Sequence, residues 1–243
     1  MREEVRALYE NLSYTNSDEL CEQMAKECDT CFMSFSIGKD SIASWLQVRK
    51  YFKKIIPFYN WFLPDGEFWQ DNLKYYEDFF GQKIYKLPSP SLWRFIRNGT
   101  FQPHERWTAI CTLRDEIPTK DYDTVQEVEI LRYLANIPDY VYCAVGNRAA
   151  DNPMRMMNIR KSGAVNHNKA TFYPVYDWNQ QRLLDEIDKA GVKLPTDYRL
   201  WSNSFDGMEY GYIAPLRQYY PRDYEKLIKT FPMAELEFIR MEE

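Results

Sequence analysis

One short segment of the sequence combines residue types that can bind a phosphate group, and it reads Ser36-Ile37-Gly38-Lys39-Asp40-Ser41. A small-residue loop between a buried strand and a helix directs backbone N–H groups and the positive end of the helix dipole at an anion. Lys39 adds a mobile charge, and Gly38 lacks a Cβ that would block a close oxygen. The two serine hydroxyls can donate hydrogen bonds, and Asp40 can cap the helix or hold Mg²⁺. These residues predict a phosphate-binding loop, and the alternative is an ordinary turn with a helix cap.

A second group of candidate anion ligands follows a later apolar run, in the stretch that begins at Gly146. Arg148 and Arg155 can clamp phosphate or sulfate oxygens by paired hydrogen bonds, and Asp151 can orient one of the guanidinium groups. Without the loop, the same stretch would be interpreted as a surface salt-bridge cluster. The two groups together predict a site for an anionic ligand.

The elements that would position these residues alternate along the chain between apolar runs and helical spacing. The predicted strands are residues 31–35, 55–62 and 140–145, and the predicted helices are residues 16–29, 42–49, 68–80, 125–134, 179–190 and one after Pro221. Between Leu87 and Lys120, repeated prolines predict an irregular excursion with one or two short helices. A loop rich in Trp, Ser, Asn and Gly is expected before the last helix.

Strands that alternate with helices are typical of an α/β fold with a doubly wound, mostly parallel sheet. Ligands of such sheets bind outside the carboxyl ends of the strands, where the loop and the Gly146 turn both fall. The length of 243 residues and the apolar content of 45% suit a single domain over residues 1–243. We expect an irregular insertion at about 87–120 and a C-terminal helical tail at about 199–243.

The net charge of −5 argues against a protein that coats nucleic acid through a general positive field, although a local basic cleft is compatible with it. Such a basic, polar loop surrounds His167 and could close over a phosphate or a nucleic-acid backbone; its residues are Arg160, Lys161, Asn168 and Lys169. The charged N-terminus has no signal peptide, and no apolar run is long enough to span a bilayer. The sequence therefore predicts a cytoplasmic protein with no membrane partner, while a protein partner stays open.

The loop resembles the S-G-G-x-D-S pyrophosphate loop of the adenine nucleotide alpha hydrolase superfamily, also called PP-loop ATP pyrophosphatases, with Ile37 in place of the first glycine. If that position needs a positive φ, the loop must be distorted or must hold its anion differently. The stretch from Gly146 to Arg155 is similar to the G-x-R-x-x-E-S-x-x-R motif of the phosphoadenosine phosphosulfate (PAPS) reductase family, with Asp for Glu and Asn for Ser. This second similarity narrows the resemblance to that family.

Three further pieces occur in the family's order. Arg106-Trp107-Thr108 resembles its R-W-C-T segment, Asp65-Gly66 corresponds to an acidic residue and glycine near the nucleotide, and the stretch from Tyr173 to Tyr198 resembles its P-x-x-x-W, helix and L-P-x-x-Y succession. The resemblance implies a Rossmann-like three-layer fold that binds ATP or PAPS with Mg²⁺. It implies metal ligands Asp40 and Asp65, catalytic residues Lys39, Arg148 and Arg155, and nucleotide contacts from Ser36, Gly38, Lys39, Asp40, Ser41, Asp65, Gly146 and Arg148.

The cysteines depart from the pattern of the family's reductases, which use a thiolate near the C-terminus and, in some members, an iron–sulfur cluster. No cysteine follows Cys143 here, and residues 204–215 offer no thiolate. Because a thiolate must take the sulfur, the sequence predicts neither sulfonucleotide reduction nor an iron–sulfur cluster. The Cys28-x-x-Cys31 pair is expected to be structural. Cys111 is kept as an outside candidate for a reactive thiol.

Three functional hypotheses follow. The first is an enzyme that cleaves ATP between the α and β phosphates, adenylates an unknown acceptor and releases pyrophosphate. The second is a nucleotide-binding accessory or regulator without chemistry, in a mobile-element or DNA sulfur-modification system. The third is a PAPS reductase that uses Cys111 or an external thiol.

Overall fold

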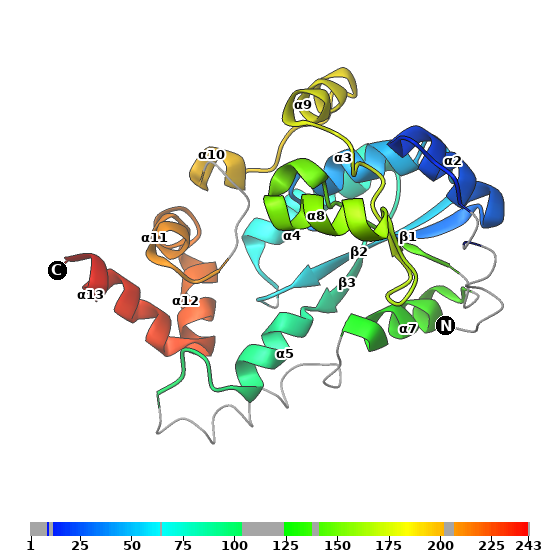
Figure 1. Cartoon of the computed structure of the whole chain (residues 1–243). Helices are drawn as coiled ribbons and strands as arrows, with labels where there is room; N and C mark the ends of the chain where they lie inside the picture. Colours follow the sequence, from blue (N-terminus) through cyan, green and yellow to red (C-terminus); the bar gives the residue numbers. More distant parts are fainter. Residues whose placement is uncertain are drawn as a thin grey trace. The chain divides into compact units, whose positions relative to one another are not determined.

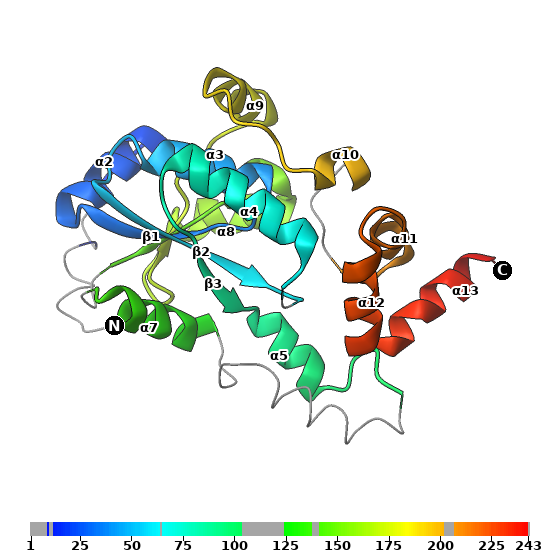
Figure 2. The same cartoon turned by 180° about the vertical axis from the view of Figure 1, so that it is seen from behind.

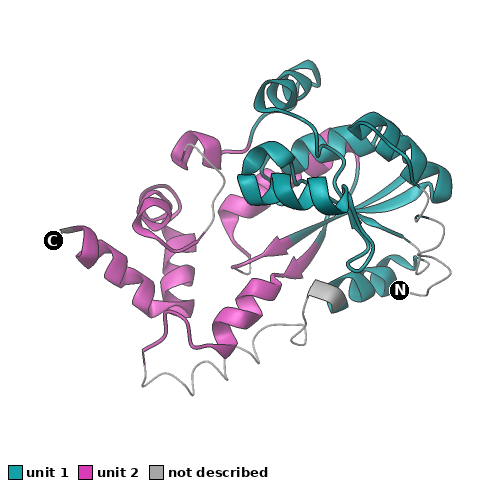
Figure 3. Ribbon diagram, in the orientation of Figure 1, with its two compact units in different colours: residues 1–59, 82–85, 125–194 teal, residues 60–81, 86–124, 195–243 magenta. Residues whose placement is uncertain are grey.

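The structure is a computed structural model that describes residues 9, 12–63, 65–103, 124–137, 141–201 and 207–242. The chain divides into two compact units, each assembled from separate stretches of sequence (Figure 3). Unit 1 comprises residues 1–59, 82–85 and 125–194, and unit 2 comprises residues 60–81, 86–124 and 195–243. The single domain over residues 1–243 stays a prediction.

The strands form one six-stranded sheet in the order β3-β2-β1-β4-β6-β5. Their bounds are β1 Thr30–Ser34, β2 Lys54–Trp61, β3 Tyr85–Pro88, β4 Cys143–Val145, β5 Val165–Asn166 and β6 Thr171–Phe172. β1 pairs in parallel with β2 and with β4, β4 pairs in parallel with β6, and β5 pairs antiparallel with β6. This topology confirms the predicted α/β fold with a mostly parallel sheet.

Helices cover both faces of the sheet in unit 1 (Figures 1 and 2). α2 (Ser17–Glu27) and α3 (Lys39–Val48) lie over one face, and α7 (Thr124–Ala135) lies over the other. α9 (Gln180–Lys189) packs on α3, while the 3-10 turn η2 (Ala149–Asp151) and α8 (Pro153–Ser162) follow β4. Every residue of α3 from Ser41 to Val48 is buried, so the helix after the predicted phosphate loop belongs to the core.

Unit 2 is predominantly helical and has an aromatic core. Its helices are α4 Glu67–Phe80, α5 Pro90–Arg97, α10 Asp197–Trp201, α11 Tyr210–Tyr219, α12 Pro221–Thr230, the 3-10 turn η3 Pro232–Glu235 and α13 Leu236–Glu242. The ring of Phe62 stacks on Phe231 and meets Phe95 edge-on. The buried carboxylate of Asp223 accepts the N–H groups of Glu67 and Phe68, each at 2.9 Å, and thereby caps α4 from α12.

Several elements differ from the sequence prediction. β4 begins at Cys143 rather than at residue 140, and α8, α11 and the β5–β6 pair were not predicted. α11 continues through Pro215 within the region predicted as a loop. Within the predicted excursion, α5 is one of the expected short helices, while residues 104–123 lie outside the described residues. Among the described helices, none is both long enough and apolar enough to cross a membrane.

Candidate functional site: the loop between β1 and α3

The predicted phosphate loop lies where the sheet reverses its direction of winding. β1 has β2 on one side and β4 on the other, and the chain leaves β1 through the loop into α3 and then β2. Connections therefore diverge at the carboxyl ends of β1 and β4, which is the topological switch point of an open α/β sheet. Residues Ser36–Ser41 follow β1 there, and Gly146 follows β4.

Ile37 has the backbone conformation that a glycine would adopt. Its φ is 66°, and its side chain is buried with 2% exposed. A β-branched residue in this left-handed region carries strain of roughly 1–3 kcal/mol. Ile37 therefore has a positive φ in spite of its β-branched side chain, and burial of that side chain can offset the local strain.

Ser41 closes the loop from inside. Its buried hydroxyl donates to the carbonyl of Gly38 at 2.8 Å and accepts the N–H of Ser36 at 3.2 Å. The hydroxyl of Ser36 lies 3.3 Å from the same oxygen, and Ser36 is itself exposed. Both serines were predicted to contact the nucleotide. The structure gives Ser41 an internal role in loop shape, and it leaves Ser36 accessible.

The first turn of α3 offers backbone donors. Within the described part of the chain, the N–H groups of Gly38 and Asp40 have no acceptor in hydrogen-bond distance. The carbonyl of Gly38 already accepts from the N–H groups of Ser41 and Ile42, so the turn itself is formed. N–H groups without an acceptor at the start of a ten-residue helix form an electropositive position suited to an anion, and Asp40 is the more accessible of the two because Gly38 is buried.

Five side chains of alternating charge connect this loop to the turn after β4. Asp40 Oδ1 lies 2.5 Å from Arg148 Nε, and Asp40 Oδ2 lies 3.3 Å from Lys39 Nζ. Asp151 pairs with Arg148 Nη2 at 2.8 Å and with Arg155 Nη1 at 2.5 Å. We call these residues the charge chain: Lys39, Asp40, Arg148, Asp151 and Arg155. The sequence predicted the members of the chain, but it did not predict the contact between Asp40 and Arg148.

Arg148 is the buried centre of the charge chain, with only 5% of its side chain exposed. Besides its two carboxylate partners, it donates to the carbonyl of Trp178 at 3.4 Å and lies 3.5 Å from Gln180 Oε1. All three guanidinium nitrogens thus have acceptors within the protein. Lys39 and Arg155 are more accessible, with 24% and 45% of their side chains exposed.

Asp151 and Asn152 fix the backbone of the turn after β4. Asp151 accepts the backbone N–H of Arg148 at 3.1 Å while its carboxylate pairs with both arginines. Asn152 caps α8 by accepting the N–H of Arg155 at 2.8 Å, and Pro153 occupies the first position of that helix. An Asn followed by Pro is a recognisable helix start. That signal was present in the sequence and could have predicted α8.

Gly146 allows the end of β4 to approach α3 closely. A Cβ at this position would lie 2.8 Å from the carbonyl carbon of Asp40 and 2.9 Å from the backbone nitrogen of Ser41. Both neighbours are backbone atoms, which cannot rotate away. Gly146 therefore permits a close contact between the end of β4 and the first turn of α3.

Asp65, the second predicted Mg²⁺ ligand, belongs to unit 2. It precedes α4 with φ 52°, and its carbonyl accepts from Lys226 Nζ at 2.6 Å. Asp40, the first predicted ligand, belongs to unit 1 and to the charge chain. Across the described residues, no three His, Cys, Asp or Glu side chains converge to hold a metal ion. Magnesium binding by Asp40 and Asp65 stays a prediction.

The described cysteines are free thiols in or near the core. Cys31 and Cys143 lie on the neighbouring strands β1 and β4, and burial raises the pKa of both thiols. Burial also raises the pKa of Cys21 in α2 and of half-buried Cys28. These four thiols therefore have little thiolate character at neutral pH. Cys111 lies outside the described residues, as do Arg106, Trp107 and Thr108.

The fold and the loop define an α/β protein with a strand–loop–helix turn at the switch point of a mostly parallel sheet. No protein-family model matches the sequence, and no curated protein matches it. One similar solved structure is the PAPS reductase from Candida auris in a phosphate complex, with a TM-score of 0.43, 13% identity, and coverage of 82% of this chain and 92% of the reductase. Another is the U34-tRNA thiolase NcsA from Methanococcus maripaludis with its [4Fe-4S] cluster, with a TM-score of 0.44, 13% identity, and coverage of 96% of this chain and 78% of the thiolase.

Proposed function

We propose that this protein is an adenine-nucleotide enzyme that cleaves ATP between the α and β phosphates and adenylates an acceptor oxygen, releasing pyrophosphate. The observation that carries the proposal is the pair of open N–H groups of Gly38 and Asp40 at the start of α3, with Lys39 between them. Donors of this kind, at a switch point of the sheet, suit the phosphates of a nucleotide.

In this proposal the accessible ends of the charge chain contact the nucleotide. Lys39 and Arg155 neutralise the phosphates, the N–H groups of the loop hold the departing pyrophosphate, and Ser36 contributes its exposed hydroxyl. Arg148 acts indirectly. Its contact with Asp40 fixes the first turn of α3, and its contact with Asp151 fixes the turn that carries Arg155.

The proposed reaction is an in-line displacement at the α-phosphorus. The acceptor oxygen forms a bond to that phosphorus while the bond to the bridging oxygen of the β-phosphate breaks. The electron pair leaves with pyrophosphate, and the proton of the acceptor passes to water. Negative charge therefore accumulates on the pyrophosphate, where Lys39 and the open N–H groups would stabilise it.

A Mg²⁺ ion would fit this arrangement in part. Magnesium takes few protein ligands and completes its shell with phosphate oxygens and water. Among the described residues, Asp40 Oδ2 contacts only Lys39, at 3.3 Å, so it could serve as one such ligand. The bound ion would supply further neutralisation of the phosphate charge.

The test is exchange of labelled pyrophosphate into ATP, run with a panel of hydroxyl and carboxyl acceptors. We expect exchange by the unaltered chain and a loss of at least about tenfold in Lys39→Ala, since Lys39 is assigned to charge that develops during the reaction. Lys26→Ala is the matched control, because Lys26 is exposed and pairs only across one helical turn with Glu22. Exchange that is equal in both variants would contradict the assignment of Lys39.

Saturable ATP binding with no exchange for any acceptor would favour the second hypothesis, a nucleotide-binding accessory or regulator without chemistry. The engagement of Arg148 with four internal acceptors is compatible with that role, because it withdraws one predicted catalytic cation from the ligand. The reductase hypothesis depends on Cys111 or an external thiol. Sulfite release from PAPS that Cys111→Ser abolishes would establish the internal version.

A further inference from the structure

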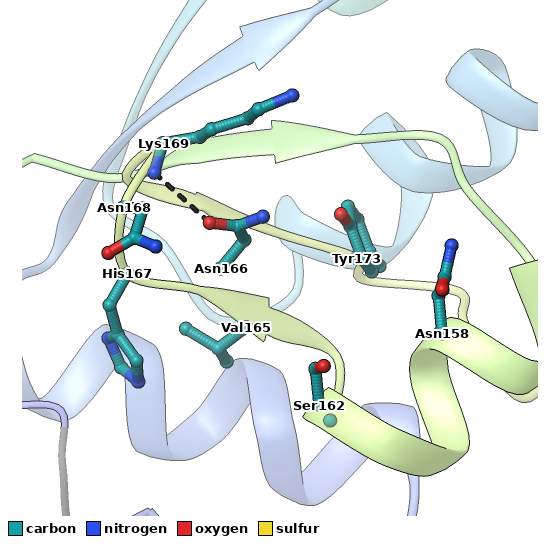
Figure 4. Close-up of a pocket in the computed structure, with 9 residues that line it drawn as sticks. Asn158, Ser162, Val165, Asn166, His167, Asn168, Lys169 and Tyr173 are labelled. Carbon is teal, nitrogen blue, oxygen red and sulfur yellow. Dashed lines mark hydrogen bonds between the residues drawn. The ribbon is translucent and has the colours of Figure 1, made fainter.

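A second concave site lies between the last turn of α8 and the β5–β6 pair, and Figure 4 shows its side chains. Its volume is about 460 Å³, within the range of small-molecule sites. We call it the hairpin pocket; its polar lining consists of Asn158, Ser162, Asn166, Asn168, Lys169 and Tyr173. Asn168 and Lys169 belong to the basic loop around His167 that the sequence predicts could close over a phosphate.

The hairpin pocket is separate from the phosphate loop in the topology of unit 1. Residues 167–169 precede β6, and β6 runs parallel to β4, so these residues lie at the amino ends of the strands. The loop at Ser36–Ser41 follows β1 at the carboxyl ends. The two sites share no residue, so residues 166–169 can be substituted without changing the phosphate loop.

The orientation of the Asn166 amide is fixed by a hydrogen bond. Its Oδ1 accepts the backbone N–H of Lys169 at 3.1 Å, and because an N–H can only donate, the oxygen must be on that side. The NH₂ group is then directed to the opposite side, which faces Tyr173 in Figure 4. Asn166 thus presents two donors to the pocket. The His167 ring points away from Asn166 in the same view.

The pocket wall is attached to the core. His167 Nδ1 lies 3.0 Å from the hydroxyl of buried Tyr142, and the carbonyl of Ala170 accepts from the N–H of Cys143 at 2.8 Å. Ala170 is buried and has φ 48°, a conformation that persists only where the surroundings impose it. The turn that carries Asn166 and Lys169 is therefore preformed, which lowers the entropic cost of binding a ligand.

The charged side chains in and near the pocket are all positive. Its lining contains Lys169 and no carboxylate. Arg160 and Lys161 in the last turn of α8 are exposed, as is Lys169, and none of the three forms an ion pair with another described residue. Amides and hydroxyls supply both donors and acceptors, while the unpaired cations supply positive charge. This combination disfavours cationic and purely apolar ligands.

We propose that the hairpin pocket binds a small phosphorylated polyol, such as a sugar phosphate. The ligand hydroxyls bond to Asn158, Ser162 and Asn166, the sugar ring packs on Tyr173, and the phosphate pairs with Lys169. A free polyol lacks the charge that Lys169 recognises. Inorganic phosphate lacks the hydroxyls that the amides recognise. Recognition therefore requires both parts in one molecule.

The test uses ribose 5-phosphate as the probe on the full chain, with ribose and inorganic phosphate as comparison arms. Backbone and side-chain amide signals of ¹⁵N-labelled protein report the binding site and the affinity. We expect saturable shifts at the Asn166 and Lys169 amides, and affinity for ribose 5-phosphate at least about tenfold higher than for either comparison compound, which corresponds to one charge-assisted hydrogen bond. Equal affinity for inorganic phosphate or for ribose would overturn the proposal, as would the absence of saturable shifts.

Two variants distinguish binding at the hairpin pocket from binding at the phosphate loop. Asn166→Asp keeps the oxygen that accepts the Lys169 N–H but replaces the inward NH₂ by an anionic oxygen, so the turn is retained. We expect it to lose binding of ribose 5-phosphate by at least about tenfold with an unchanged melting temperature. Lys39→Ala removes a cation from the phosphate loop and should leave this affinity unchanged. If Lys39→Ala abolished binding and Asn166→Asp did not, the sugar phosphate would occupy the phosphate loop, and the hairpin pocket proposal would be wrong.

Discussion

The charge chain and the hairpin pocket are both rich in cations, but they use them differently. In the charge chain, three cations share the carboxylates of Asp40 and Asp151, and the central one, Arg148, is buried. Lys169 lines the hairpin pocket, and Arg160 and Lys161 lie nearby in the last turn of α8; all three are exposed and form no ion pair with any described residue. The first arrangement fixes the backbone, and the second leaves charge available to a ligand.

The same difference between internally paired and accessible cations exists within the charge chain. Arg148 is committed to internal acceptors, whereas Lys39 and Arg155 at its ends keep accessible charge. A motif arginine can therefore be essential for a site without contacting the ligand. Substitutions that separate stability from binding are the direct way to distinguish the two roles.

The largest expected effect comes from Arg148→Ala. Removal of this buried guanidinium leaves the mostly buried carboxylates of Asp40 and Asp151 without their shared partner, which we expect to cost about 3–5 kcal/mol of unfolding free energy. Arg155→Ala is the matched control in the same network. Arg155 is 45% exposed, so its loss should cost at most about 1 kcal/mol. Urea unfolding measures both, and equal losses would contradict the structural role of Arg148.

Under the proposed function, Arg155→Ala changes stability little but should weaken ligand binding directly. Arg155→Ala should weaken ATP binding by at least about tenfold in a folded protein, because Arg155 is an accessible end of the charge chain. Titration calorimetry at a temperature well below the melting transition provides the measurement. An Arg155→Ala variant with unchanged ATP affinity would exclude Arg155 as a nucleotide ligand.

A slightly smaller effect is expected from Gly146→Ala. The new Cβ would lie 2.8–2.9 Å from backbone atoms of Asp40 and Ser41, so β4 and α3 must separate, and we expect a loss of about 1–3 kcal/mol. Gly211→Ala is the matched control. It lies in α11 with nothing within 4 Å of the added Cβ, so it should stabilise the chain by up to about 1 kcal/mol. Thermal unfolding of both variants should therefore give shifts of opposite sign.

The sequence predicted the parts of the site that are local. The loop residue types, the strand before them and the helix after them lie within a few positions of one another, and their pattern led to the fold class as well. The role of Arg148 could not be predicted in the same way. Its main partner, Asp40, is 108 residues earlier, and only the pairing of β1 with β4 brings the two together.

Short elements account for most of the remaining differences. β5 and β6 have two residues each, too few to show alternation in the sequence, so the hairpin pocket could not be predicted from periodicity. α8 has no buried residue and therefore no apolar face, although Asn152 and Pro153 marked its start. The opposite error occurred at α11, where a composition rich in Trp, Ser, Asn and Gly predicted a loop in a segment that is helical and continues through Pro215.

A smaller and more specific effect is expected at Ile37, where strain and burial oppose each other. Ile37→Ala and Ile37→Gly both remove the buried side chain, but only glycine adopts φ 66° without strain. We therefore expect the glycine variant to be more stable than the alanine variant by about 1 kcal/mol, the reverse of the usual order. Urea unfolding of the two variants makes the comparison. An alanine variant at least as stable as the glycine variant would mean that the loop relaxes away from the positive φ.

The smallest effect on stability is expected from the exposed cations in and beside the hairpin pocket. Replacement of Arg160, Lys161 and Lys169 by Gln removes no ion pair with a described residue, so each change should alter the unfolding free energy by at most about 0.5 kcal/mol. At low salt the triple variant should be slightly more stable than the unaltered chain, because repulsion between the adjacent charges of Arg160 and Lys161 is removed, and the gain should vanish near 1 M salt. Urea unfolding at two ionic strengths measures this. A large, salt-independent loss of unfolding free energy would mean that these cations stabilise the fold as Arg148 does. The distinction between internally paired cations and cations accessible to a ligand would then be wrong.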